Sequence, residues 1–89
     1  MSLDTVKLIF TQRYGVSADE MNADTLIADV CTDSLEVLEL LMYIEEEFSI
    51  NVPDDVAQEL KTLGDISGFI DKTIPETTLN EIAQKLQNN

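Results

Sequence analysis

The hydroxyl group of Ser34 is the side chain in this sequence whose position most favours chemistry. It lies in Asp33-Ser34-Leu35-Glu36, at the start of an apolar and acidic segment that continues to residue 48. At the positive end of a helix, a hydroxyl group can accept a phosphate group, because the helix dipole favours added negative charge there. Taken alone, the tetrapeptide more simply predicts a helix cap. No nearby residue can act as a base for Ser34, so another protein's active site would have to activate it.

The rest of the chain provides no catalytic set. It has no histidine and a single cysteine, Cys31, so neither a Cys-His pair nor a Ser-His-Asp set can be assembled. The acidic residues lack the alternating ligands and central glycine of a calcium loop, and no glycine-rich phosphate loop occurs. We therefore expect a protein that is not an enzyme and that has no specific metal site. Weak, diffuse divalent binding along residues 34–48 remains an alternative.

The charge of the chain is strongly one-sided. The formal net charge is -13, and the segment between Arg13 and Lys61 holds thirteen acidic residues and no basic one. Such a surface repels phosphate backbones and anionic lipids, so we expect no nucleic-acid partner and no membrane insertion. It attracts basic patches on other proteins and speeds encounters with them. At this point, a merely solubilising surface explains the charge equally well.

Cysteine usage and hydropathy indicate the compartment. One cysteine cannot form an internal disulfide, which fits a reducing compartment. Residues 1–10 lack the extended apolar core of a signal peptide, and no run of about 18 apolar residues could span a membrane. We therefore expect a cytoplasmic protein. At 89 residues it should form one small, monomeric domain with a thin core.

Helical spacing of the apolar residues predicts an all-α fold. The predicted helices cover Leu3–Tyr14, 34–48, a short segment from Asp54 or Asp55 to Leu60, Leu63–Thr73, and a last segment from Thr77 or Thr78 to Leu86. We expect Ser2 or Asp4 to cap the first helix and Gly15 to end it. The chain is thus a small four-helix bundle with an extra C-terminal helix. Residues 1–74 form the main domain and 75–89 form the extension.

A long loop is expected between the first two helices. It covers Val16 to Cys31 and is rich in residues that favour turns. A loop of about 15 residues in so small a domain is often functional. Its apolar residues should attach it to the core: Val16, Met21, Leu26, Ile27 and Val30.

The helix predicted from Ser34 carries two apolar stripes. The first has core spacing and comprises Val37, Leu40, Leu41, Ile44 and Phe48. The second is displaced from it and comprises Leu35, Leu38 and Met42, with Glu39 and Glu46 beside it. A bundle this thin cannot bury both stripes. The second stripe therefore indicates a docking surface, unless the loop or the C-terminal segment covers it. Asp33 is the expected cap, with Glu36 completing a capping-box-like pair.

At these residues the sequence resembles the acyl carrier protein family. The matching positions are Asp33-Ser34-Leu35-Glu36, then Glu39 to Phe48 in the pattern E-L-x-M-x-[IL]-E-E-E-F, then Val52-Pro53-Asp54-Asp55. The fixed spacing makes this match far more specific than Asp-Ser-Leu alone. The resemblance covers about residues 1–74.

The resemblance implies a covalent cofactor and a set of partners. A phosphopantetheinyl transferase would attach 4'-phosphopantetheine from coenzyme A to Ser34, and the terminal thiol would carry acyl groups as thioesters. Acyl-transferring or condensing enzymes with basic patches would bind the helix that begins at Ser34. The contacts implied are Asp33, Leu35, Glu36, Leu38, Glu39, Met42, Glu45 and Glu46.

The resemblance also implies a cleft that shelters the acyl chain. By position, its candidates are Leu26, Ile27, Leu40, Ile44, Val52, Leu60, Ile66 and Ile70, although plain core packing explains these residues equally well. An aminoacyl or peptidyl carrier of a synthetase is an alternative within the same fold. An acidic interaction module that is never modified is an alternative from another class.

The resemblance implies a carrier of fatty acid, lipid or polyketide synthesis, and two departures from the family pattern suggest a specialised member rather than the general fatty-acid carrier. The usual G-x-D-S-L pattern has Cys31 in place of glycine, and a Cβ there restricts positive φ. Cys31 is either a buried small hydrophobic residue or a thiol near the arm. The chain also continues about 15 residues beyond the usual last helix. That segment either packs on the bundle or selects a partner.

Overall fold

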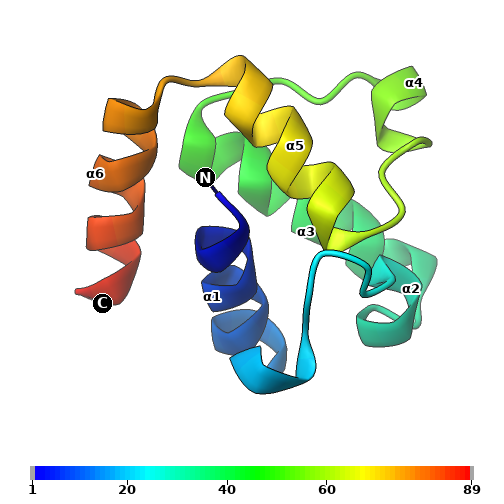
Figure 1. Ribbon diagram of the computed structural model, residues 1–89. Helices are drawn as coiled ribbons and strands as arrows, with labels where there is room; N and C mark the ends of the chain where they lie inside the picture. Colours follow the sequence, from blue (N-terminus) through cyan, green and yellow to red (C-terminus); the bar gives the residue numbers. More distant parts are fainter. Residues whose placement is uncertain (1, 89) are drawn as a thin grey trace.

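The computed structural model describes residues 2–88 and confirms the all-α architecture (Figure 1). Among these residues no β-strand occurs, and Leu26 and Thr62 form one isolated bridge. The elements in chain order are α1 (Leu3–Tyr14), the 3-10 helix η1 (Ala18–Glu20), α2 (Ile27–Val30), α3 (Ser34–Phe48), α4 (Asp54–Ala57), α5 (Leu63–Thr73) and α6 (Glu76–Gln87).

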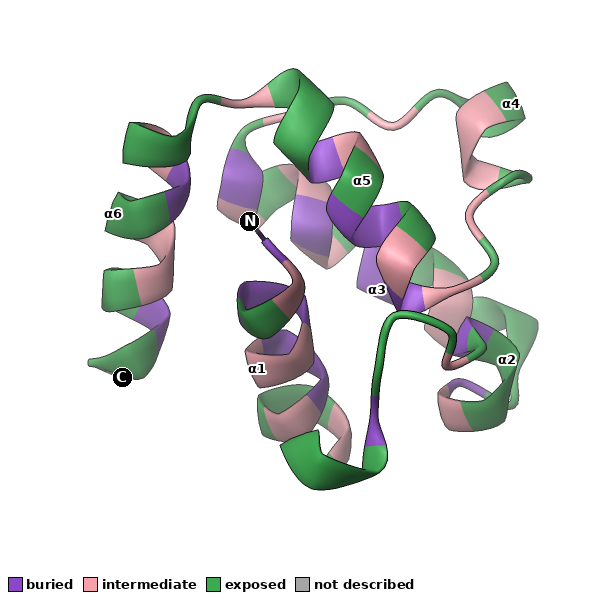
Figure 2. Ribbon diagram, viewed as in Figure 1, coloured by how far each residue is buried: buried purple, intermediate pink, exposed green. Residues whose placement is uncertain are grey.

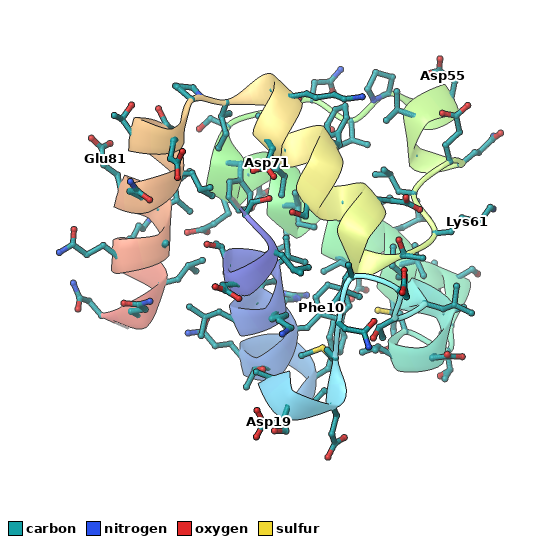
Figure 3. The ribbon with its side chains drawn as sticks, in the orientation of Figure 1. Phe10, Asp19, Asp55, Lys61, Asp71 and Glu81 are labelled. Carbon is teal, nitrogen blue, oxygen red and sulfur yellow. The ribbon has the colours of Figure 1, made fainter. Side chains whose placement is uncertain are left out.

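Helix α1 has the predicted bounds, and one face of it packs into the core. Val6, Ile9 and Phe10 follow the helical spacing and are fully buried, and Figure 3 shows Phe10 directed toward the interior. Gly15 ends the helix with a φ of 73°, and its N–H donates to the Thr11 carbonyl over 2.9 Å. The local residues therefore account for both the length and the end of this helix.

Ser2, one of the two predicted residues, is the N-cap of α1, but the expected side-chain capping bond does not form. Neither Ser2 nor Asp4 makes a side-chain capping bond; instead Ser2 is buried and binds α5. Its hydroxyl group donates to the Ser67 carbonyl over 2.9 Å, and its N–H donates to Asp71 Oδ1 over 3.0 Å. The start of α1 is thus tied to a helix about 65 residues further along the chain, a contact that local sequence could not reveal.

The core of the bundle lies between α1, α3 and α5. On α3, four of the five residues of the predicted core stripe are buried and Val37 is half-buried; the four are Leu40, Leu41, Ile44 and Phe48. Figure 2 shows the buried residues of these helices on the sides that face one another. Helix α3 ends at Phe48, and the next residue, Ser49, is its C-cap and adopts a left-handed conformation with a φ of 54°.

The long segment after α1 contains η1 and α2 rather than a continuous loop. Met21 and Ile27 are buried and attach it to the core, as predicted, while Val16 and Val30 are half-buried. The prediction is wrong for Leu26, whose side chain is 47% exposed.

Backbone hydrogen bonds hold this segment against the residues before α5. The N–H of Ile27 donates to the Lys61 carbonyl over 2.9 Å, and the N–H of Leu63 donates to the Thr25 carbonyl over 3.0 Å. Because α2 is followed almost directly by α3, these bonds help to position the start of α3.

Two further predictions, the end of the third predicted helix and the capping box of the second, are wrong. Helix α4 ends at Ala57 and does not reach Leu60. The capping box expected of Asp33 and Glu36 does not form between those two described residues. A full box occurs instead at α5, where the Thr62 hydroxyl accepts from Asp65 N–H over 3.1 Å and Asp65 Oδ2 accepts from Thr62 N–H over 3.1 Å.

The C-terminal helix α6 packs on the bundle and begins at Glu76, one or two residues before the predicted start at Thr77 or Thr78 (Figure 1). Leu79 and Leu86 on its inner face are buried. Gln12 Nε2 donates to the Leu86 carbonyl over 2.9 Å, which fastens the end of α6 to α1. Lys85 Nζ lies 3.6 Å from Glu47 Oε1 on α3. The extension is therefore joined to both α1 and α3.

Candidate functional site

Ser34 is the first residue of α3, and its side chain is exposed. The preceding residue, Asp33, caps the helix: its Oδ1 accepts a 2.9 Å hydrogen bond from the Leu35 N–H. The Ser34 hydroxyl makes no hydrogen bond to any other residue among those described. Because Asp33 caps the helix, the Ser34 hydroxyl group is not used for capping. It remains available to an external reagent at the positive end of a 15-residue helix.

An apolar groove of about 440 Å³ adjoins Ser34. It lies between α3 and α4, and besides Ser34 it is lined by Val37, Leu38, Leu41, Asp54, Ala57 and Gln58. None of the eight predicted acyl-cleft residues is in this set. The missed signal was helical spacing, because residues 34, 37, 38 and 41 share one side of a helix.

The predicted acyl-cleft residues lie elsewhere in the fold. Five of the eight are buried within the packed core: Ile27, Leu40, Ile44, Ile66 and Ile70. Val52 and Leu60 are half-buried, and Leu26 is exposed. Leu60 lines a separate groove of about 310 Å³ between α4 and α5.

The displaced apolar stripe of α3 is exposed, as the sequence predicts. The exposed fractions are 63% for Leu35, 57% for Leu38 and 59% for Met42, and neither the long loop nor α6 covers them. Glu39 and Glu46 on the same helix are also exposed. The structure therefore brings apolar and acidic side chains together on the outer surface of α3.

The other acidic residues predicted to contact partners are already hydrogen-bonded or are less exposed. Asp33 is engaged in the cap, and Glu36 is half-buried. Glu45 is half-buried as well, and its Oε2 accepts a 2.8 Å hydrogen bond from the Val52 N–H.

Cys31 lies just before α3 and is 2% exposed. Its φ of -98° is one that any residue adopts, so the glycine of the family pattern is not required here for a positive φ. Burial raises the pKa of its thiol, and a hydrogen bond with the Tyr14 side chain acts in the opposite direction. The thiol is therefore neutral at neutral pH, which fits a small buried hydrophobic residue.

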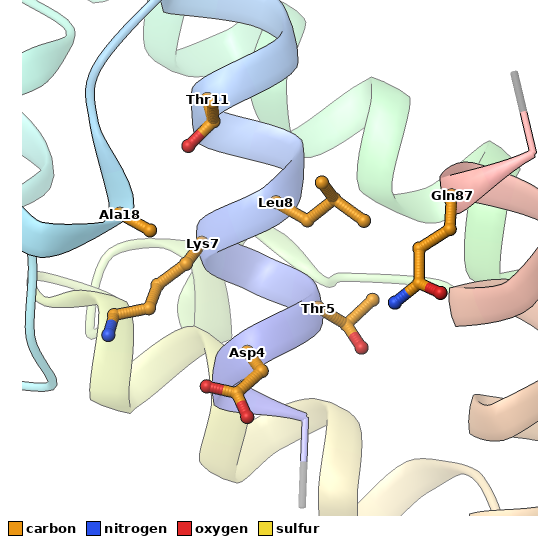
Figure 4. A pocket seen from close by; sticks show the side chains of 7 residues that line it. All are labelled: Asp4, Thr5, Lys7, Leu8, Thr11, Ala18 and Gln87. Atoms are coloured by element: carbon orange, nitrogen blue, oxygen red, sulfur yellow. The ribbon is translucent and has the colours of Figure 1, made fainter.

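Another groove, of about 380 Å³, lies along α1 and the end of α6 (Figure 4). Its lining residues include Leu8, Thr11 and Gln87, and Ser34 is not among them. Within residues 2–88, no group of three or more metal-ligating side chains could hold a metal ion. No helix formed by these residues is long and apolar enough to cross a membrane.

The fold and the site define a small helical domain in which the exposed hydroxyl group of Ser34, at the start of α3, stands beside an apolar groove. Comparison with known proteins agrees with this description. The model of the family "Phosphopantetheine attachment site" matches residues 4–70. The chain is 40% identical over 68 residues to the acyl carrier protein of Bdellovibrio bacteriovorus, covering 75% of this chain and 87% of that protein. It is 42% identical over 69 residues to the acyl carrier protein of a Sulfurovum species, covering 76% and 92%.

The chain belongs to the acyl carrier protein family. The covalent cofactor of this family is phosphopantetheine, and its members are named as carriers of acyl groups. The sequence-based assignment of family and cofactor is therefore confirmed.

Proposed function

We propose that the chain holds acyl intermediates as thioesters on a phosphopantetheine arm attached to Ser34. It would present them to enzymes of fatty acid, lipid or polyketide synthesis. The observation that carries the proposal is the exposed Ser34 hydroxyl, which is left without a partner because Asp33 caps α3. The arm would supply a terminal thiol, which forms a thioester with an acyl group.

The residues around Ser34 fit the cofactor. A phosphodiester at the first residue of α3 places negative charge at the positive end of the helix. The groove beside Ser34 offers apolar side chains from α3 and α4 to the arm or its cargo. The eight core residues named from the resemblance remain candidates for an acyl cleft only if the core opens, because most of them are packed together.

The outer surface of α3 supports the proposed partners. We define the docking surface as Leu35, Leu38, Glu39, Met42 and Glu46, which are all exposed. A partner with an apolar centre and basic surroundings would complement it. Asp33, Glu36 and Glu45 would border that contact. The expected partners are the transferase that modifies Ser34 and the enzymes that exchange acyl groups. We expect the carrier to act in the cytoplasm as a monomer.

Modification by coenzyme A tests the proposal directly. The purified chain is incubated with coenzyme A, Mg²⁺ and a phosphopantetheinyl transferase, and its mass is measured. We expect a gain of one phosphopantetheine in the wild type and no gain in Ser34→Ala. Thr32→Ala is the matched control, since Thr32 is an exposed hydroxyl two residues earlier and should leave the gain unchanged. Modification of Ser34→Ala would refute the assignment.

The mass of protein isolated from its native host separates the alternatives. An acyl thioester supports the main proposal, whereas an aminoacyl or peptidyl thioester would make the chain a synthetase carrier. Native protein that never carries an arm would make it an unmodified interaction module.

A further inference from the structure

Arg13 is a basic residue at the edge of the acidic docking surface. It lies in the last turn of α1, and together with Glu39, Met42, Tyr43 and Glu46 it lines a groove of about 250 Å³. Three of these residues belong to the docking surface defined above. A positive charge from α1 therefore stands among the side chains of α3 that partners would contact.

Two aromatic rings hold the guanidinium group in place. Its central carbon lies 4.6 Å from the centre of the Tyr43 ring and 6.0 Å from that of Tyr14. The Tyr14 ring in turn packs against the ring of Phe10 at 5.8 Å. Cation–π contacts within about 6 Å of a ring centre are favourable, so turning Arg13 away from the two tyrosine rings would cost free energy.

The charge of Arg13 is not neutralised by an ion pair. No acidic group among residues 2–88 lies within 4.0 Å of its guanidinium group, although Glu39 and Glu46 line the same groove. A partner surface that is uniformly basic would bring positive charge against Arg13 as it approached these two glutamates. Like charges placed together across an interface oppose binding.

The groove is close enough to Ser34 to be covered by an enzyme acting there. At 1.5 Å per residue, Glu39 and Glu46 lie roughly 8 and 18 Å along the helix axis from Ser34. A typical interface buries roughly 800 Å² of each partner, which extends over this distance. An enzyme that reaches Ser34 while it contacts Glu39, Met42 and Glu46 of the docking surface meets Arg13 as well, because these residues line one groove with Arg13.

We propose that Arg13 determines specificity in this docking: it pairs with a carboxylate of the phosphopantetheinyl transferase, whose basic side chains contact Glu39 and Glu46. The matching surface of the transferase thus has mixed charge. This inference rests on the proposed function, because it requires that Ser34 is modified by an enzyme that docks on α3.

Kinetics of modification test the inference. The wild type, Arg13→Gln, Arg13→Lys and Lys72→Gln are each modified by the same transferase with coenzyme A, and kcat and KM for the carrier are measured at low ionic strength. We expect Arg13→Gln to raise KM about two- to fivefold with kcat unchanged, as the loss of one exposed ion pair implies. Arg13→Lys should restore most of the affinity.

The controls separate the possible outcomes. Lys72 is an exposed base on α5, so Lys72→Gln removes the same charge outside the groove and should leave KM unchanged. Circular dichroism shows whether each variant is folded. A KM for Arg13→Gln equal to or below that of the wild type overturns the inference while leaving the proposed function standing. A wild-type chain that is never modified at Ser34 overturns both.

Discussion

The backbone N–H of Val52 donates a 2.8 Å hydrogen bond to Oε2 of Glu45. The N–H of Ile50 also donates to the Glu45 carbonyl over 3.1 Å. One residue near the end of α3 thus binds the following loop through both its side chain and its backbone. That loop leads to α4, which forms one wall of the groove beside Ser34.

Replacement of Glu45 should therefore affect stability. We expect Glu45→Ala to lower the free energy of unfolding by about 1 kcal/mol, because the half-buried Val52 N–H loses its acceptor. Glu45→Gln keeps an acceptor oxygen and should retain most of that stability. Glu46→Ala is the matched control, because Glu46 is exposed on the adjacent position. Equal urea midpoints for the two alanine variants would contradict this role of Glu45.

Charge reversal at Glu39 should weaken docking without unfolding the chain. Glu39→Lys removes an exposed acid from the docking surface and adds a base, so KM for the transferase should rise and its dependence on salt should become flatter. Glu81→Lys makes the same change on α6, which Figure 3 shows on the side of the molecule away from α4. If the two variants behave alike, only net charge matters and α3 is not the interface.

Two glycines of α5 should respond in opposite ways to alanine. A Cβ on Gly64 would lie 2.8 Å from the Ala23 carbonyl oxygen, which itself accepts the Gly64 N–H, so Gly64→Ala should destabilise the chain by about 1–3 kcal/mol. A Cβ on Gly68 meets nothing within 4 Å. Gly68→Ala should therefore stabilise the helix by about 0.5–1 kcal/mol. Thermal melts measure both, and a stable Gly64→Ala variant would mean that the two segments do not pack this closely.

Residues 75–89, proposed as an extension of the carrier domain 1–74, should contribute to its stability. Leu86 is 1% exposed, so Leu86→Ala should cost about 2–5 kcal/mol through lost burial and a new cavity. Gln84→Ala on the exposed side of α6 is the control and should change little. A single unfolding transition that shifts only in Leu86→Ala would support this view. An unchanged midpoint would indicate that α6 is not part of the cooperative unit.

Cys31 should react slowly with alkylating reagents in the folded chain. Burial raises the pKa of its thiol above the ordinary value of 9.0, so the reactive thiolate is scarce at neutral pH and its fraction rises only under more alkaline conditions. We expect labelling by iodoacetamide to be slow at pH 7 and fast once the chain is unfolded in urea. Rapid labelling of the native protein at pH 7 would show instead that the thiol is accessible.

The elements that local sequence could predict are those determined by neighbouring residues. The bounds of α1 and α5 follow from apolar spacing that ends at Gly15 and before Pro75. The start of α3 follows from Asp33, whose side chain caps the adjacent turn. Leu26 was misplaced because periodicity shows that a residue is apolar but not whether a neighbouring segment covers it.

By itself, the sequence determined the helical class, the family, and a serine available at a helix start, since periodicity, caps and a fixed motif depend on residues close together in the chain. Only the tertiary structure decided which side chains share a space. It places Ala57 of α4 in one groove with Ser34 of α3, and it places Arg13 of α1 beside Met42 of α3. The physical reason is that these neighbours come from different helices, and their approach depends on packing of the whole core.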